Sequence, residues 1–359
     1  MFRHILKISL FQRLSQQRSS SLTTSIPVVD VSALMNCSSS FEQHPSSSMI
    51  KASKLFSEAL RQYGFVYIKN SHVTPLLVEE TLLQSRWLFS QSEELKSKNL
   101  LTSNCHRGYY KFTSACVDDK IEAYSICRDI EQPYSLKQDY FQQLYDNDEK
   151  QLEKIKNQYN QINKWPPMNS EFKRIMLDYW LKCQKTSTDL LWSLAKYLNL
   201  EDPSIFIKQH SKHDNNMEIK YYPKLETKTK TTSEQMLRFP VHCDLTTLTL
   251  LCQDRESGLE IYNQNTNTWI AAPSTDDSIL VNCGDLMEVW SNYYYPSTKH
   301  RVIQNTNNDK SDRISIVYFV FPNYETEIAP IQHQFASQTT TKNSDFEPFQ
   351  VGDRMPFLL

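Results

Sequence analysis

The feature that most constrains this fold is a series of short, closely spaced β-strand patterns in the C-terminal half. Each segment is rich in β-branched and aromatic residues, and turn residues separate it from the next. Helical patterns dominate the preceding half. This arrangement predicts an α+β protein with a double-stranded β-helix, or jelly-roll, core and helices packed outside it. The predicted strands are 217–222, 238–251, 258–262, 269–271, 279–282, 300–304 and 313–321.

Helical patterns and their end signals fill much of the N-terminal half. Gly64 fits the C-terminal cap of a helix over 50–63, and Thr74-Pro75 fits the start of another. We expect Ser170 to cap the longest helix. The apolar stripe of that helix is better explained by core packing than by a cofactor site. The polar segment 146–160 predicts a solvated helix.

Charge, glycine and cysteine usage exclude several classes of protein. The formal net charge is −2, so the chain lacks the basic surface that binds nucleic acid or anionic membranes. The five glycines are isolated, which excludes a P-loop and a Rossmann fingerprint, and no apolar stretch is long enough to span a membrane. The eight cysteines form no Cys-X-X-Cys pair, which predicts reduced thiols. We therefore expect a monomer without nucleic-acid or membrane partners.

Residues 1–24 differ in composition from the rest of the chain. They carry Arg3, Lys7, Arg13 and Arg18, many serines and no acidic residue. This composition is typical of a mitochondrial transit peptide, although the apolar residues form a poor helical face. A short disordered extension explains the segment equally well. The predicted location is therefore cytoplasmic or mitochondrial.

A His-X-Asp pair lies in the segment 238–251. On a strand, His242 and Asp244 would point to the same face and Cys243 to the opposite one. A second histidine, His300, opens another alternating run and would complete a set of two imidazoles and one carboxylate if the strands pair. Non-haem Fe(II) oxygenases use this set and leave adjacent coordination positions open. Taken alone, the pair fits a hydrogen-bonded core histidine better than a metal site. His333, beyond the last strand, fits a solvated loop.

Arg313 and Ser315 repeat the same spacing on the last predicted strand. An arginine fork beside a hydroxyl on one face suits a carboxylate, because the guanidinium can bind it through two parallel hydrogen bonds. A structural salt bridge is the alternative for an isolated arginine.

The joint pattern, His-X-Asp, His300 and Arg-X-Ser, resembles the isopenicillin-N-synthase-like branch of the 2-oxoglutarate- and Fe(II)-dependent dioxygenases. Other motifs of this branch cover nearly everything from about residue 25 onward. They are 25–30 (Ser-Ile-Pro-Val-Val-Asp, an opening strand), 63–70, 107–109 (Arg-Gly-Tyr), 221–223 (Tyr-Tyr-Pro), 282–285 (Asn-Cys-Gly-Asp) and 297–302. On this resemblance we expect an extension over 1–24, a mainly helical region over 25–210, the jelly-roll core over 211–325 and an irregular tail over 326–359.

The resemblance implies an enzyme that oxidises, by default hydroxylates, a small molecule with O2 and releases succinate and CO2. It implies that His242, Asp244 and His300 hold Fe(II). Arg313 and Ser315 would then bind the distal carboxylate of 2-oxoglutarate, with a contact from the Tyr222 hydroxyl. Two alternatives stay open: an Fe(II) oxidase that does not use 2-oxoglutarate, and a non-catalytic jelly-roll binding protein.

Substrate contacts are predicted from strand parity and from one departure. Many relatives have Asn-Tyr-Tyr-Pro where this chain has Lys220 before Tyr221. Lys220 is expected either to meet a carboxylate in the pocket or to pair with Glu218. The other candidate contacts are aromatic residues, for which core packing is the alternative: Tyr109, Tyr110, Phe319 and Phe321.

Overall fold

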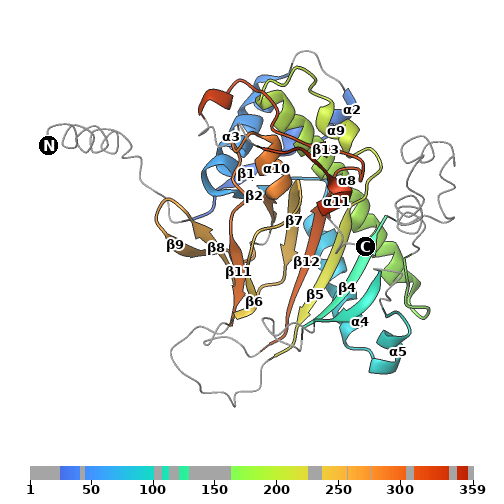
Figure 1. Cartoon of the computed structure of the whole chain (residues 1–359). Helices are drawn as coiled ribbons and strands as arrows, with labels where there is room; N and C mark the ends of the chain where they lie inside the picture. The colour runs from blue at the N-terminus through green and yellow to red at the C-terminus, as the bar shows by residue number, and fades with distance from the viewer. Residues whose placement is uncertain are drawn as a thin grey trace.

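The structure is a computed structural model that describes most of the chain after residue 24 (Figure 1). The described residues are 25–40, 45–100, 107–112, 121–128, 163–224, 237–256, 258–275, 277–304, 311–338 and 346–354. The N-terminal extension 1–24 and the predicted helix 146–160 lie outside them.

The largest element is an eight-stranded sheet with the order β1-β2-β10-β7-β12-β5-β4-β3. Only β1 and β2 run parallel; the other neighbours in this sheet are antiparallel. The N-terminal region contributes four of the eight strands, because β1 to β4 extend both edges of the sheet. Its strands are β1 (Val28–Asp30), β2 (Phe65–Lys69), β3 (Gly108–Lys111), β4 (Glu122–Cys127), β5 (Asn216–Tyr222), β7 (Leu248–Gln253), β10 (Ser278–Cys283) and β12 (Arg313–Val320).

A second, four-stranded antiparallel sheet faces the first and completes the jelly roll. Its order is β6-β11-β8-β9, and its strands are β6 (Leu237–His242), β8 (Leu259–Asn263), β9 (Thr268–Ala271) and β11 (His300–Ile303). Apolar side chains from both sheets form a small core between them, which includes Phe65, Tyr222, Leu259 and Val302. Two sheets whose apolar faces pack together are the arrangement that the alternating strand patterns predicted.

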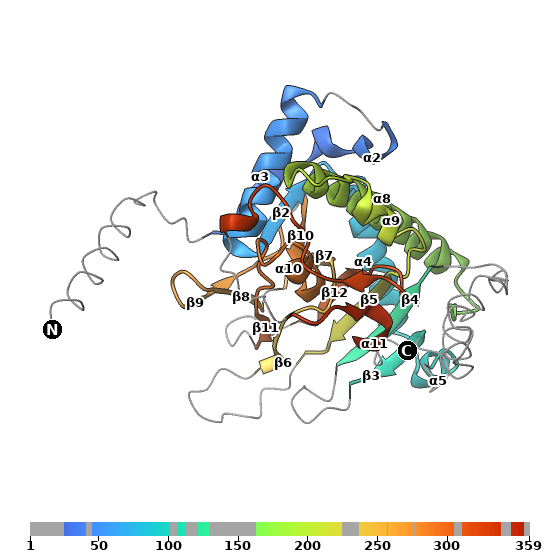
Figure 2. The same ribbon diagram turned by 45° about the horizontal axis from the view of Figure 1, so that its top comes forward.

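The helices cover the other face of the eight-stranded sheet. Figure 2 shows α3 and α8 along one side of this sheet and β6, β8, β9 and β11 on the other. The buried residues of α3, α4 and α8 join the larger apolar core with the sheet residues beneath them. The helices are α2 (Cys37–Ser40), α3 (Ser47–Tyr63), α4 (Pro75–Phe89), α5 (Glu93–Ser97), α8 (Ser170–Tyr197), α9 (Ile205–Gln209), α10 (Asp285–Trp290) and α11 (Val351–Arg354). Short elements complete the chain: η1 (Ser32–Leu34), β13 (Glu327–Ile328), η2 (Ala336–Gln338) and β14 (Phe349–Gln350).

Helix ends follow the sequence signals with one correction. Gly64 has φ +70° and its N–H donates to the Leu60 carbonyl, so it caps α3 as predicted. Thr74 caps α4 by accepting a hydrogen bond from the Leu77 N–H. The cap of α8 is Asn169 rather than Ser170, since the Asn169 side chain accepts from the Phe172 N–H. None of the described helices combines the length and apolar character that a membrane crossing requires.

The segment predicted as one strand over 238–251 is two strands in different sheets. It crosses from β6 to β7 through a turn that starts after His242. The Asp285 N–H donates to the Asp244 carbonyl at this turn. Gly284 makes the close approach of the two segments feasible, because a Cβ on this glycine would collide with the backbone of Asp244 and Thr246. The prediction that Asp244 lies on the strand was therefore wrong, because its backbone belongs to the turn.

Candidate active site

His242, Asp244 and His300 converge at one end of the space between the two sheets. His242 ends β6 and is the direct cross-strand partner of His300, which starts β11. The Nε2 atoms of His242 and His300 lie 3.7 and 3.5 Å from Asp244 Oδ1. One ligand atom from each residue lies within 4.8 Å of the others, and this is the one cluster of metal-binding side chains in the described part of the chain. The cross-strand pairing therefore assembles the set that the sequence pattern predicted.

Neighbouring groups orient all three side chains. The Nδ1 atom of each imidazole is within hydrogen-bond distance of a backbone carbonyl, Pro240 for His242 and Thr298 for His300. Donation from Nδ1 leaves Nε2 as the lone-pair nitrogen that a metal needs. The second oxygen of Asp244, Oδ2, accepts from Asn282 Nδ2 at 2.9 Å and from Thr249 Oγ1 at 2.8 Å. Asp244 Oδ1 is thereby directed toward the two Nε2 atoms.

The charge state of this cluster suits a cation. Burial alone would raise the pKa of Asp244, but the neighbouring imidazoles and the Asn282 amide lower it, so the carboxylate is ionised. Burial, together with the charge of His300, lowers the pKa of His242 to about 4. The His300 pKa is raised, because Asp244 more than offsets the effect of burial. One carboxylate and at least one neutral imidazole therefore face the same point, which is the donor set of a 2-His-1-carboxylate metal site.

Arg313 lies at the other end of the same cavity, on β12. It is 5 % exposed, and its Nη2 atom donates to Gln253 Oε1 at 2.8 Å. Its Nε and Nη1 atoms are buried and have no hydrogen-bond partner in the described part of the chain. Unpaired buried donors of a guanidinium are costly in the absence of an acceptor. The geometry therefore provides a two-donor fork for an anion that is not part of the protein.

The remaining predicted co-substrate residues lie beside Arg313. Tyr222 on β5 is its register partner, and the guanidinium carbon lies 4.8 Å from the centre of the Tyr222 ring. Ser315 is buried and lines the same cavity. Asp254 is not an ion-pair partner of Arg313, because its Oδ2 atom accepts from Arg86 and from the Ile314 N–H. The structural salt bridge considered for Arg313 is thus not formed with the described residues.

The predicted substrate contacts separate into two groups. Lys220 and Phe319 line the cavity together with the metal-binding and co-substrate residues. Tyr109 does not, because its hydroxyl donates to Glu122 away from the cavity. Phe321 lies beyond the end of β12 in the larger core, next to Phe319 but outside the cavity lining. Tyr110 reaches the site indirectly, since its hydroxyl donates to Glu218 Oε1 at 2.8 Å.

Two histidine-related predictions also have structural outcomes. Cys243 points away from the cluster, as predicted, toward the Ser297 carbonyl. His333 is half-buried rather than solvated, because its Nε2 atom bonds the Ser291 carbonyl and its ring packs on Tyr294. It takes no part in the cluster.

Several residues of the site were not singled out from the sequence for these roles. Asn282 and Thr249 orient Asp244, Gln253 holds Arg313, and Phe239 forms one wall of the cavity. Their positions depend on pairing between strands that are distant in sequence. For Asn282 a signal existed, because it belongs to the Asn-Cys-Gly-Asp motif quoted for the family resemblance.

Comparison with known proteins places this geometry in context. The profile described as the 2OG-Fe(II) oxygenase superfamily matches residues 213–322, and the profile of the non-haem dioxygenase N-terminal region matches residues 26–168. A bi-functional coumaroyl CoA and feruloyl CoA ortho-hydroxylase from Ipomoea batatas is 28% identical over 87% of this chain and 75% of its own length. Homoarginine-6-hydroxylase from Glycine max is 27% identical over 86% of this chain and 88% of its own length.

Solved structures agree on the fold. An enzyme from Neurospora crassa, crystallised with α-ketoglutarate and thymine, superposes with a TM-score of 0.71 over 91% of this chain and 94% of its own, at 22% identity. A dioxygenase for auxin oxidation from Arabidopsis thaliana, in complex with 2-oxoglutarate, has a TM-score of 0.62 over 85% of this chain and 96% of its own, at 21% identity. At these identities the match establishes the jelly-roll fold.

Proposed function

We propose roles for individual residues from the premise that this chain belongs to the 2OG-Fe(II) oxygenase superfamily. It is an Fe(II)- and 2-oxoglutarate-dependent oxygenase, an oxidoreductase that acts on a small molecule. The open questions are which side chains do which task and what the substrate is. The single observation that carries our answer is that a metal-binding triad and an arginine with two unpaired donors line one cavity.

His242, Asp244 and His300 hold Fe(II). The fit is supported by the donor set itself, since two imidazole nitrogens and one carboxylate oxygen suit Fe(II) and leave coordination positions open. Bound Fe(II) supplies the activation of O2 that couples decarboxylation of 2-oxoglutarate to oxidation of the substrate. The protein contributes orientation: the carbonyls of Pro240 and Thr298 fix the imidazoles.

Arg313, Ser315 and Tyr222 bind 2-oxoglutarate. The Nε and Nη1 donors of Arg313 suit the distal carboxylate of the co-substrate, which accepts two parallel hydrogen bonds from a planar fork. Burial strengthens this contact, because little water competes for the donors. The cavity continues from Arg313 to the triad, so a carboxylate held at Arg313 directs the opposite end of the molecule toward the open metal positions.

The reaction that we propose is hydroxylation of the substrate with release of succinate and CO2. Apolar and aromatic walls exclude water from the reacting centre, and they include Phe65, whose ring lies edge-on to His300 at 5.4 Å. An organic acid bound at Arg313 and a substrate bound beside Phe319 would thus meet at the triad from different sides.

The test is 2-oxoglutarate consumption in air with reconstituted Fe(II), measured as succinate formation. We expect turnover in the wild type and none in His300→Ala, which keeps the packed sheets but lacks one ligand. Stoichiometric iron and full succinate formation in His300→Ala would contradict the assignment. Iron-dependent O2 consumption without succinate would indicate the oxidase alternative.

Three broader assignments are also proposals. We propose a monomer that does not bind nucleic acid or membranes, in keeping with the net charge of −2. We retain the division into an extension (1–24), an N-terminal region (25–210), the catalytic core (211–325) and a tail (326–359). A cytoplasmic or mitochondrial location is tested by fusing residues 1–40 to a fluorescent reporter. Mitochondrial fluorescence that is lost when Arg3, Arg13 and Arg18 become Glu would indicate a transit peptide.

A further inference from the structure

Lys220 is a buried cation in the wall of the active-site cavity. It is 8 % exposed and lies on β5 opposite Ser315 of β12, between Arg313 and the triad. Burying an ammonium group is costly unless it is paired, and such a group in a cleft often serves binding or catalysis. The role of Lys220 therefore depends on what its donors meet.

One of its partners is an anchoring carboxylate. Lys220 Nζ lies 3.2 Å from Glu218 Oε2, and the other oxygen of Glu218 accepts from the Tyr110 hydroxyl at 2.8 Å. Both oxygens of Glu218 are thus engaged, and its carboxylate is held in place on the same face of β5. Glu218 fixes the direction of the ammonium group, and one of the three N–H donors is sufficient for this contact.

The other neighbours of the ammonium group are aromatic rings. Lys220 Nζ lies 4.6 Å from the centre of the Phe239 ring, 5.6 Å from Phe319 and 5.8 Å from Phe112. These faces stabilise a cation but do not replace a strong hydrogen-bond acceptor. Glu218 is the one acceptor of Lys220 in the described part of the chain. Two of its N–H donors therefore remain available to a molecule in the cavity.

The ammonium group stays charged and acts on the reacting centre. Burial would lower the pKa of Lys220, but the charges of Glu218, Tyr222 and Asp244 raise it. After burial and the neighbouring ligands, the charge of Lys220 also acts on the pKa of His242. An anion held by Lys220 would accordingly lie next to the metal-binding triad.

We propose that Lys220 binds a carboxylate of the substrate, so that the substrate is an organic acid whose apolar body packs against Phe239 and Phe319. The inference rests on the proposed function, in which Arg313 and the metal positions already take both ends of 2-oxoglutarate. A second cation in the cavity is then available to a second acid. Phe239 and Phe319 line the cavity and offer apolar surface beside the ammonium group.

The test is equilibrium binding of matched acids and amides to the full chain loaded with Zn(II) and 2-oxoglutarate, a combination that cannot turn over. The probes are benzoate, 3-phenylpropanoate and octanoate, each compared by calorimetry with its primary amide. We expect at least one acid to bind about ten- to hundredfold more tightly than its amide, as the loss of one charged hydrogen bond predicts. Lys220→Met should abolish that difference and leave amide binding unchanged.

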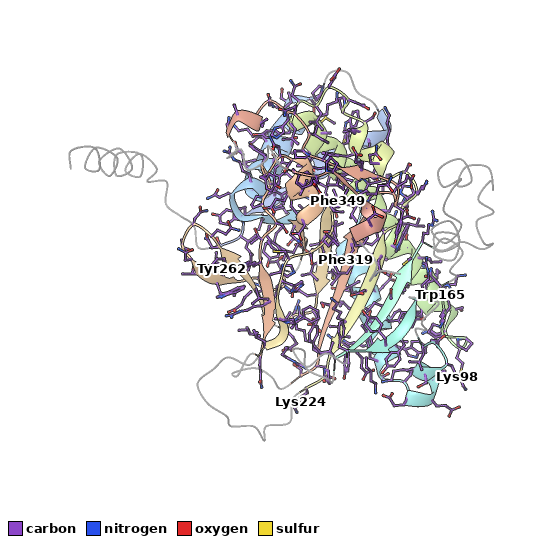
Figure 3. All side chains as sticks on the ribbon, in the orientation of Figure 1. Lys98, Trp165, Lys224, Tyr262, Phe319 and Phe349 are labelled. Atoms are coloured by element: carbon purple, nitrogen blue, oxygen red, sulfur yellow. The ribbon has the colours of Figure 1, made fainter. Side chains whose placement is uncertain are left out.

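Two further variants keep the result interpretable. Lys220→Met leaves Glu218 buried without its cation, so the double variant Lys220→Met with Glu218→Gln removes both charges and preserves a partner for Tyr110. Lys224→Met is the matched control, because Lys224 is exposed beyond the end of β5 and lies apart from Phe319 (Figure 3). It should retain the preference for acids.

Titration of 2-oxoglutarate into the same Zn(II)-loaded preparations separates the two levels of inference. No 2-oxoglutarate binding by the wild type would contradict the proposed function itself. If 2-oxoglutarate binds but acids and amides bind alike, or neither binds, the organic-acid inference is overturned. It is equally overturned if Lys220→Met loses 2-oxoglutarate while the wild type binds it, because Lys220 would then serve the co-substrate.

Discussion

Replacing Arg313 by lysine tests how the cavity binds 2-oxoglutarate. The guanidinium has three sets of N–H donors; Nη2 is used by Gln253, and Nε and Nη1 are buried without a partner. Lysine keeps the positive charge but offers a single point of donation in place of the planar fork. One charged hydrogen bond to the ligand is lost, which costs about 1.5 to 3 kcal/mol. The expected result is a roughly ten- to hundredfold rise in the dissociation constant for 2-oxoglutarate.

The assay is calorimetric titration of 2-oxoglutarate into Zn(II)-loaded protein, with Zn(II) content measured on the same samples. Metal content should not change in Arg313→Lys, because Arg313 lies at the opposite end of the cavity from the triad. Ser315→Ala removes a neutral donor and should weaken binding less. Arg174→Lys is the surface control, since Arg174 pairs with Glu171 on the exposed face of α8. Equal 2-oxoglutarate affinity in the wild type and Arg313→Lys would refute the assignment of the two unpaired donors.

Two further predictions concern orientation and stability. Asn282→Ala removes one of the two donors to Asp244 Oδ2 and should weaken Zn(II) affinity about 10- to 100-fold in a chelator competition, whereas Thr249→Ser should keep it; unchanged affinity in Asn282→Ala would show that Thr249 alone suffices. Burial lowers the pKa of His210 to about 4 from 6.5, so its neutral ring stabilises the fold above pH 6.5, and this contribution is lost as the pH falls toward 4. In urea titrations between pH 7 and pH 5 the wild type should lose roughly 2 kcal/mol more stability than His210→Gln; equal losses would mean that His210 is not held neutral.

The sequence was sufficient to predict the chemistry of the triad but not its local backbone. His242, Asp244 and His300 were identified by residue type and by family resemblance, and their convergence follows from the β6–β11 pairing. The turn that carries Asp244 was missed, because the apolar and β-branched residues on both sides of it read as one continuous strand. Only the close packing of Gly284 against that turn distinguishes the two arrangements.

Substrate contacts were less accessible because they depend on which face of a strand meets which sheet. Strand parity correctly grouped Phe319 with Arg313 and Ser315, since all three lie on β12 and line the cavity. It failed for Phe321, which follows the last residue of that strand. Tyr109 and Tyr110 are adjacent and point to opposite faces of β3, and nothing in the local sequence shows which face borders the cavity.

The two expectations for Lys220 are compatible in the structure. The pair with Glu218 is formed, and the lysine also lines the cavity. Local sequence suggested the pair through the i, i+2 spacing on β5. The aromatic surroundings required long-range contacts, because Phe112, Phe239 and Phe319 come from three different parts of the chain.

The measurement that most directly tests the account is anaerobic addition of 2-oxoglutarate to the Fe(II)-reconstituted chain, followed by visible absorption spectroscopy. The account predicts a metal-to-ligand charge-transfer band in the wild type that saturates at one 2-oxoglutarate per chain. Asp244→Ala should lose the band together with its iron, and Arg313→Lys should keep its iron and require more 2-oxoglutarate for the same band. Absence of the band from an iron-loaded wild type, or its persistence in Asp244→Ala, would contradict the central claim that this cavity joins a His-Asp-His iron site to a 2-oxoglutarate site.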